Sequence, residues 1–366
     1  MNLNQKSNAL LITTYLHQDE VTINRNSAEL TYLAEVCDLN VTEALLIRLR
    51  TINPATLLGK GKVNQIKVLI ETQEIDYLVF YETLSSVQLR NLSQTLNVDV
   101  LDRNDLILKI FDARAQSKFG KLQVKLATLK YELPRLIGTT DYSGLVGGRT
   151  RGKGEQQLEL DRRYLQREIT KTEKQIAKQK EIYQTSRQRR KRHSIPQVVL
   201  VGYTNVGKST ILNCLQNTSN LKKQVYTADN IFASLDTSSR KVYLKNQSYC
   251  FVTDSVGFIS NLPKPLLEAF YATLLEIEDA DLIIHVLDSS SSDLEFQIET
   301  TKKILQDLKV NQKPILYILN KIDLISDDIV LPTINSNTLK ISAIDKLCPE
   351  LLKNAIYNSL KENNHF

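Results

Sequence analysis

Residues 202–210 read Gly-Tyr-Thr-Asn-Val-Gly-Lys-Ser-Thr, and this stretch decides the fold class of the segment around it. An apolar run at residues 198–201 precedes it and predicts a buried parallel strand, while the spacing of residues 211–215 predicts a helix. A strand, a glycine-rich turn and a helix in this order form a cradle for phosphate, because backbone N–H groups and the positive helix terminus face one point. The alternative is a tight turn that matches by chance.

Two further motifs stand after buried strands and remove that alternative. Asp254 follows apolar residues 249–252, as an aspartate on the magnesium side of a phosphate site should. Residues 320–323 read Asn-Lys-Ile-Asp and follow apolar residues 315–319. The carboxylate of Asp323 can accept both the ring N–H and the exocyclic amine of guanine, a pair that adenine does not offer. We therefore predict GTP and GDP as ligands and disfavour an ATP-driven motor.

The predicted nucleotide site collects residues from these segments. Lys208 is expected on the phosphates, the Ser209 hydroxyl on Mg²⁺, and Asp254 on the same metal through water. Gly257 is expected to sense the γ-phosphate with its N–H group, which makes Lys208, Asp254 and Gly257 the predicted catalytic set. The predicted nucleotide-binding positions are Gly202, Tyr203, Thr204, Asn205, Val206, Gly207, Lys208, Ser209, Thr210, Asp254, Gly257, Asn320, Lys321, Asp323, Ser342 and Ala343.

Two residues bear on the rate of hydrolysis. Phe258 follows Gly257, where Ras-like GTPases have a glutamine that orients the attacking water. We therefore expect slow turnover that rises when a partner orders the site. The carbonyl of Asn205 could help to hold K⁺ beside the phosphates and supply positive charge there, and the alternative is a hydrogen bond that stabilises the loop.

Length and composition fit a protein of more than one domain without a membrane span. The 366 residues leave room for two or three domains, and no apolar run approaches the roughly 18 residues that a span needs. The N-terminus lacks the pattern of a signal peptide. The four cysteines are scattered without metal-site spacing, so we expect free thiols in a reducing cytosol. The expected protein is cytoplasmic and, by default, a monomer.

The positive charge is concentrated in one segment. The chain carries 47 Lys and Arg against 41 Asp and Glu, a net charge of +6. Residues 149–193 hold 15 of the basic and 6 of the acidic residues, a balance of +9, which leaves −3 for the remainder. A polyanionic partner is therefore expected at this segment rather than elsewhere.

Residues 1–115 are predicted to form a small α/β domain. Strand-like and helix-like stretches alternate there, which is typical of a parallel sheet with covering helices. A Gly-Lys-Gly-Lys turn at residues 59–62 is either an anion site or a helix entry. The expected strands are residues 10–16, 44–49, 75–80 and 98–101, and the expected helices are residues 28–37, 62–71 and 86–96.

Residues 116–194 are predicted to form a long antiparallel helical hairpin, a coiled coil, followed by a basic linker. Apolar positions recur there with steps of three and four residues, which is typical of a coiled-coil seam. The seam positions are Phe119, Leu122, Leu126, Leu129, Leu133 and Leu136 in the first helix and Leu158, Leu165, Ile169, Thr172, Ile176 and Tyr183 in the second.

The connecting loop of the hairpin spans residues 137–154 and contains six of the twelve glycines. Glycine permits close approach to phosphates and arginine forks suit their geometry, so we expect Arg149, Arg151 and Lys153 to contact RNA. The alternative is a solvated spacer whose charges keep it soluble. The basic run at residues 187–192 is interpreted as a linker, or as a nuclear-localisation signal.

Residues 195–362 are predicted to form a doubly wound P-loop GTPase domain, followed by a short tail at residues 363–366. Together with motifs upstream, this domain resembles the HflX family of bacterial ribosome-associated GTPases. The hairpin motifs narrow the match, because the GTPase motifs alone indicate only a superfamily. The motifs that carry the resemblance are residues 53–62, 120–124, 154–163, 202–210, 228–237 and 254–259.

The resemblance implies binding to the large ribosomal subunit, with the hairpin loop reaching toward the peptidyl-transferase region, and separation of stalled or idle ribosomes into subunits. It implies that Ser234 contacts the nucleotide and coordinates Mg²⁺ together with Ser209 and Asp254. The family usually has Thr at the position of Ser234, and Thr237 is a nearby alternative for the same role. Lys153 stands where the family usually has proline, which relaxes and charges the loop. Many members have a further C-terminal domain, which we expect to be absent here.

Two functions follow from these observations. In the first, GTP binding gives affinity for the ribosome and hydrolysis gives release. In the second, the chain is a nucleotide-gated RNA-binding or ribosome-assembly module in which hydrolysis is incidental. A non-hydrolysable GTP analogue distinguishes them, because subunits separate with the analogue only under the first.

Overall fold

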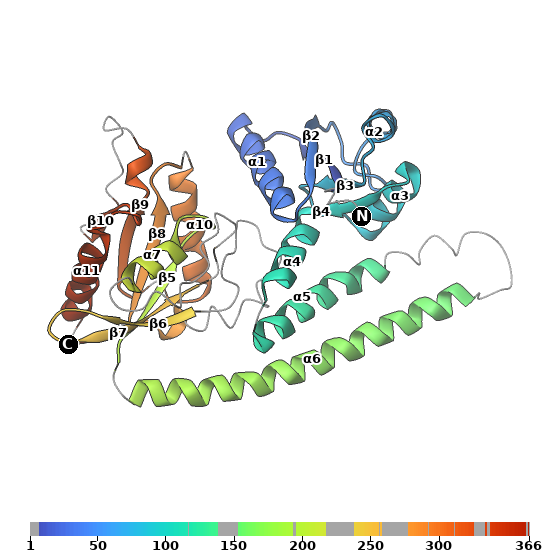
Figure 1. The fold of residues 1–366 in the computed structure, drawn as a ribbon. Coiled ribbons are helices and arrows are strands. Elements are labelled where there is room, and N and C mark those ends of the chain that lie inside the picture. Colours follow the sequence, from blue (N-terminus) through green and yellow to red (C-terminus); the bar gives the residue numbers. More distant parts are fainter. Residues whose placement is uncertain are drawn as a thin grey trace, which may run out of the picture. The chain divides into compact units, whose positions relative to one another are not determined.

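The computed structural model describes residues 7–115, 117–137, 153–192, 195–216, 238–255, 257, 277–291, 293–310, 312–325, 334, 337–363 and 365 (Figure 1). The chain divides into two compact units, Met1–Ala113 with Val124–Gln175 and Arg114–Gln123 with Ile176–Phe366. We call these the first and the second unit and describe each by itself. The domain boundaries at residues 115, 194 and 362 stay predictions.

The first unit contains a four-stranded parallel sheet, as the alternation of elements predicts. Its inner strand β1 is buried from Ala9 to Thr14, which explains why this stretch is almost continuously apolar. The edge strand β2 alternates between exposed and half-buried residues along most of its length, so its polar first half gives little apolar signal. The strands are β1 (Asn8–Tyr15), β2 (Asn40–Arg48), β3 (Tyr77–Phe80) and β4 (Asp99–Asp102), in the order β2-β1-β3-β4.

The helices α1 (Glu20–Val36), α2 (Lys60–Gln73), α3 (Ser86–Leu96) and α4 (Arg103–Arg114) belong to the same unit. Local signals fix their starts: Asp19 caps α1, and Ser85 with Gln88 forms a capping box on α3. Gly59 is the N-cap of α2, so the turn at residues 59–62 is a helix entry. The sequence pattern did not predict α4, because the polar residues Arg103 and Asn104 are buried together with its apolar side chains and weaken the contrast between its two faces.

Helices α5 (Lys118–Ile137) and α6 (Lys153–Arg192) form the predicted antiparallel hairpin (Figure 1). Ion pairs Lys125–Glu168, 2.6 Å, and Lys130–Glu173, 3.1 Å, join the two helices. The side chains of residues 137–157 and 182–192 are outside the described part of the chain. Among the predicted seam residues, Leu126, Leu129, Leu165, Ile169, Thr172 and Ile176 are buried.

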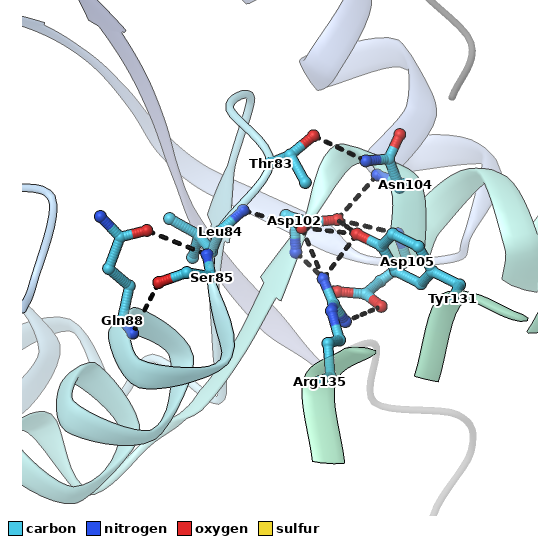
Figure 2. A network of polar contacts seen from close by, with 9 residues as sticks. All are labelled: Thr83, Leu84, Ser85, Gln88, Asp102, Asn104, Asp105, Tyr131 and Arg135. Atoms are coloured by element: carbon cyan, nitrogen blue, oxygen red, sulfur yellow. Dashed lines mark hydrogen bonds and ion pairs between the residues drawn. The ribbon is translucent and has the colours of Figure 1, made fainter. Parts of the chain in front are cut away.

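A buried polar network attaches α5 to the sheet of the first unit (Figure 2). Asp102, at the end of β4, is fully buried and accepts hydrogen bonds from the Tyr131 hydroxyl at 2.7 Å and from the Arg135 guanidinium at 2.5 Å. Arg135 also pairs with Asp105 at 2.7 Å, and the backbone N–H of Leu84 donates to Asp102 at 3.1 Å. The C-terminal half of α5 is therefore held on the α/β domain by charge-assisted hydrogen bonds.

The second unit contains a six-stranded sheet in which only the edge strand β6 runs antiparallel to its neighbour. This doubly wound arrangement is the predicted one. The strands are β5 (Gln197–Val201), β6 (Ser238–Tyr243), β7 (Tyr249–Asp254), β8 (Leu282–Asp288), β9 (Ile315–Asn320) and β10 (Thr338–Lys340), in the order β10-β9-β8-β5-β7-β6. Among the described helices are α7 (Lys208–Gln216), α10 (Leu294–Asp307), the 3₁₀ turn η2 (Ile322–Leu324) and α11 (Cys348–Glu362).

Side chains that alternate along these strands belong to two hydrophobic cores, one on each face of the sheet. Val198 and Leu200 of β5 pack in one cluster with residues of α7 and α11, including Leu212 and Leu352. On the other face, Leu287, Tyr317 and Leu319 cluster with Leu294 and Ile298 of α10. Helices thus cover both faces, which explains the near-continuous apolar runs of β5, β8 and β9. None of the helices in the described residues has an apolar stretch that could cross a membrane.

Candidate functional site

The turn between β5 and α7 has a backbone that only glycine can adopt at two positions. Gly202 and Gly207 have φ angles of +152° and +93°. A Cβ atom at Gly202 would lie 2.2 Å from the carbonyl oxygen of Val286, and one at Gly207 would lie 2.3 Å from Nδ2 of Asn320. The predicted phosphate-binding loop is therefore a tight turn with close neighbours on both sides.

Lys208 begins α7 and folds back over this loop. Its Nζ atom donates to the carbonyl oxygens of Gly202 at 3.2 Å and Tyr203 at 2.7 Å, and the residue is buried. Burial lowers the pKa of Lys208 to about 8, and the nearby charge of Asp254 opposes that shift only in part. A phosphate in the loop would supply the negative charge that this ammonium group needs.

Ser209 and Asp254 meet beneath the loop. Asp254 ends β7 and is fully buried, and its Oδ2 atom accepts a hydrogen bond of 2.6 Å from the Ser209 hydroxyl. Both groups are hard oxygen donors that suit Mg²⁺. A Mg²⁺ site beside a nucleotide uses few protein carboxylates, because phosphate oxygens complete the coordination. Accordingly, the described residues contain no group of three or more His, Cys, Asp or Glu positioned for a metal.

Gly257 lies close to the loop. A Cβ atom there would be 2.8 Å from Cα of Thr204 and 3.0 Å from Nζ of Lys208. Its backbone is therefore adjacent to the lysine that is expected on the phosphates. The following Phe258 and the predicted metal ligand Ser234 lie outside the described residues, as does Thr237.

Asn320 joins the phosphate loop to the segment after β10. Its Nδ2 atom donates to the carbonyl oxygen of Val206 at 2.9 Å, and its Oδ1 atom accepts from the N–H of Ala343 at 3.0 Å. Ser342, next to Ala343, is buried. The residues expected near guanine and those expected near phosphate are thus connected by one side chain.

The remaining guanine-motif residues lie at the carboxyl end of β9. Lys321 has a φ of +63° and its Nζ atom pairs with Asp288 at 2.7 Å. Asp323 is exposed in η2, so its carboxylate is available to a ligand. The sequence analysis did not identify Asp288, although a polar residue after the buried run of β8 was a signal comparable to Asn320 after β9.

The structure brings together most of the residues predicted for the nucleotide. Asn205 has a φ of +62° and is exposed at the loop tip, between half-buried Tyr203 and Gly207. Thr210 continues α7. The RNA-binding candidates are not tested in the same way, because Arg149 and Arg151 lie outside the described residues and only the backbone of Lys153 is described, at the start of α6.

Comparison with known proteins matches every part of this architecture. Residues 24–112, 114–190 and 197–321 match three families, described as GTP-binding GTPase N-terminal, GTP-binding GTPase Middle Region and 50S ribosome-binding GTPase. The chain is 40% identical over 345 residues to GTPase HflX of Caldanaerobacter subterraneus subsp. tengcongensis, covering 94% of this chain and 78% of that protein. The chain belongs to the HflX family of GTPases.

A second HflX protein and a solved structure support this assignment. GTPase HflX of Alkalihalophilus pseudofirmus is 37% identical over 354 residues, which cover 96% of this chain and 82% of that protein. The crystal structure of SsGBP in complex with GDP is 27% identical, with a TM-score of 0.55 over 97% of this chain and 99% of that chain. The resemblance and fold class predicted from the sequence are confirmed, and so is the assignment as a GTPase.

Proposed function

We propose that this HflX-family chain is a GTP-driven switch that binds the large ribosomal subunit and separates stalled or idle ribosomes into subunits. GTP binding would give affinity for the ribosome, and hydrolysis would give release. The observation that carries the enzymatic part is the cluster of Lys208, Ser209, Asp254 and Gly257 around a glycine turn.

Within this proposal, each side chain has a separate task. Lys208 binds the β- and γ-phosphates, and Gly257 donates its N–H to the γ-phosphate. Ser209, Asp254 and Ser234 hold Mg²⁺, which when bound neutralises charge on the phosphates. Asp323 binds guanine, with Ala343 and Ser342 packed beside the base.

The rate of hydrolysis is expected to depend on the partner. Phe258 has no group that can orient a water molecule, so the basal rate should be slow and should rise with ribosomes. Asn205 is exposed at the loop tip, where its oxygen could bind K⁺ beside the phosphates. Equal hydrolysis rates in potassium and sodium would leave Asn205 with a structural role only.

The ribosome-binding part is supported by a basic stripe on α6. Arg163, Arg167, Lys171 and Lys174 are exposed and recur at helical spacing, on the face opposite the buried residues Leu165, Ile169 and Thr172. A phosphate backbone is a partner that this charge fits.

Sedimentation with purified ribosomes tests the proposal. The protein should pellet with large subunits in GTP more than in GDP or without nucleotide, and ribosomes should separate into subunits. With a non-hydrolysable analogue, subunits should still separate while the protein stays bound. Binding without separation in any nucleotide state would contradict the proposal and favour an RNA-binding or assembly module.

A further inference from the structure

Two buried thiols are in contact beside the nucleotide loop. Cys214 is on α7, the helix that begins at Lys208, and Cys348 is the first residue of α11. Their Sγ atoms are 2.9 Å apart, and the residues are 6% and 1% exposed. Both are free cysteines. Because 134 positions separate them along the chain, no spacing pattern reveals the pair.

The surroundings of the two thiols differ in a way that suits oxidation. Their hydrogen bond lowers the pKa of Cys214, with help from the positive charge of Lys353, and raises the pKa of Cys348. Cys214 is therefore the thiol that ionises first, and the thiolate is the form that reacts with oxidants. The sulfur atoms need only a small approach to reach the S–S bond length of about 2.05 Å.

The pair lies directly beneath an exposed turn. Ile344 and Leu347 are 78% and 64% exposed, and Leu347 immediately precedes Cys348. The N–H of Cys348 donates to the carbonyl oxygen of Asp345 in the same turn, at 3.2 Å. Access of hydrogen peroxide to the two sulfur atoms would require this turn to open.

The same turn connects the pair to the nucleotide site. Ala343, at its start, donates its N–H to Asn320. The pair thus joins the segment beside the predicted guanine position to the helix that carries Lys208 and Ser209 on the phosphate side. Residues of α7 and α11 pack in one hydrophobic core, and a covalent bond between the two helices would restrict any movement of one side of the site relative to the other.

We propose that Cys214 and Cys348 are a redox modification site, at which hydrogen peroxide forms a disulfide that slows the release of GDP. The Cys214 thiolate attacks peroxide, becoming a sulfenic acid as hydroxide leaves. The Cys348 thiol then displaces the oxygen from that sulfur, and the S–S bond forms with loss of water. Overall, two thiols and one peroxide give one disulfide and two waters. The inference rests on GTPase activity and not on ribosome binding.

Mass spectrometry and a GDP-release assay on the full chain test the proposal together. After treatment with hydrogen peroxide, the peptides that contain Cys214 and Cys348 should be joined. Release of a fluorescent GDP analogue should slow by about fivefold or more, as a typical coupling between sites would give. Dithiothreitol should restore the original release rate.

Variants separate this pair from other thiols. Cys214→Ser and Cys348→Ser should release GDP at the same rate before and after peroxide. Cys37→Ser, which removes a half-buried thiol of the first unit, should respond like the unchanged chain. If the two serine variants fail to fold, reversal by dithiothreitol decides the matter. Separate oxidation of the two cysteines, or a disulfide that leaves GDP release unchanged, would overturn the proposal.

Discussion

Lys208 is the side chain whose charge depends most on what binds the loop. It is buried, and the carbonyl oxygens of Gly202 and Tyr203 solvate its ammonium group only in part. The resulting pKa of about 8 is close enough to neutrality for nucleotide binding and protonation to be coupled.

We expect GDP affinity to fall as pH rises above about 8. Bound phosphate raises the pKa of Lys208. The charged lysine therefore makes its full contribution to the free energy of GDP binding below the pKa of about 8 that it has in the free protein. Above that pH, binding must take up a proton and should weaken by up to about tenfold per pH unit until the pKa of the bound form is reached. Titration of a fluorescent GDP analogue at increasing pH measures this effect.

The Lys208→Arg variant provides the control for this prediction. Its guanidinium group stays charged over the same pH range, so any dependence that remains comes from other groups. A flat pH profile for the unchanged chain, or the same slope in both proteins, would contradict the assigned role of Lys208.

Gly207→Ala should weaken nucleotide binding. The φ of +93° is strained for alanine, and the new Cβ would lie 2.3 Å from Nδ2 of Asn320. The free loop should relieve this strain by leaving the conformation seen here, and restoring that conformation on binding costs about 1–3 kcal/mol, so GDP affinity should fall by about fivefold or more. Gly61→Ala is the matched control, because a Cβ in α2 meets nothing within 4 Å. Equal affinity in the two variants would show that the loop accommodates a side chain.

Helix α5 shows how one element is fixed by a few polar contacts. The buried carboxylate of Asp102 accepts hydrogen bonds from both Tyr131 and Arg135, which stand one helical turn apart on α5 (Figure 2). Burial is the main cause that raises the pKa of Asp102, and the charge of Arg135 opposes it. Asp102 therefore relies on its partners from α5 to remain buried as a charged group.

Arg135→Met should destabilise the first unit. Removing the guanidinium leaves Asp102 buried without its cation, which costs about 3–5 kcal/mol in comparable sites. Chemical denaturation of the full chain, followed by a probe in the first unit, measures the loss. Lys125→Met on the same helix is the control, because its ion pair with Glu168 is exposed and solvent screens the attraction. Comparable losses of unfolding free energy in the two variants would mean that the buried network stabilises the protein no more than an exposed ion pair does.

The basic stripe of α6 makes a separate prediction about salt. The double variant Arg167→Gln, Lys174→Gln should bind large ribosomal subunits less tightly and with a weaker dependence on salt, because fewer counterions are released. Lys303→Gln, Lys309→Gln removes the same charge from exposed positions of the second unit and should bind normally. Sedimentation at several salt concentrations measures both. Equal binding by the two double variants would exclude the stripe as a contact surface.

At the scale of the whole molecule, the sequence predicted those elements whose apolar and polar residues alternate with a regular local period. The four strands of the first sheet, strands β5, β7 and β9 of the second, the hairpin and the phosphate loop all have patterns that a few neighbouring residues carry, whereas β6 and β8 were not predicted. Helix α4 was missed because two polar residues are buried on its apolar side, and β2 was predicted too short because its first residues are polar at an edge.

Contacts between distant residues could not be predicted in this way. The Cys214–Cys348 pair and the attachment of Arg135 to Asp102 join residues that no spacing rule relates. Asn320 was expected from its motif, but its hydrogen bonds to Val206 and Ala343 arise only when three loops fold against one another. For the site, the sequence thus proposed candidate residues, and the fold determined which of them touch.

The position of Asn320 affects how substitutions there should be interpreted. When a substitution abolishes the preference for guanine, the replaced residue is ordinarily taken to contact the base directly. Here one amide is bonded to both the loop expected at the phosphates and the loop expected at the base, so its removal should also disturb the phosphate side. Base selectivity in this protein is better assigned by changing the nucleotide than by changing residue 320.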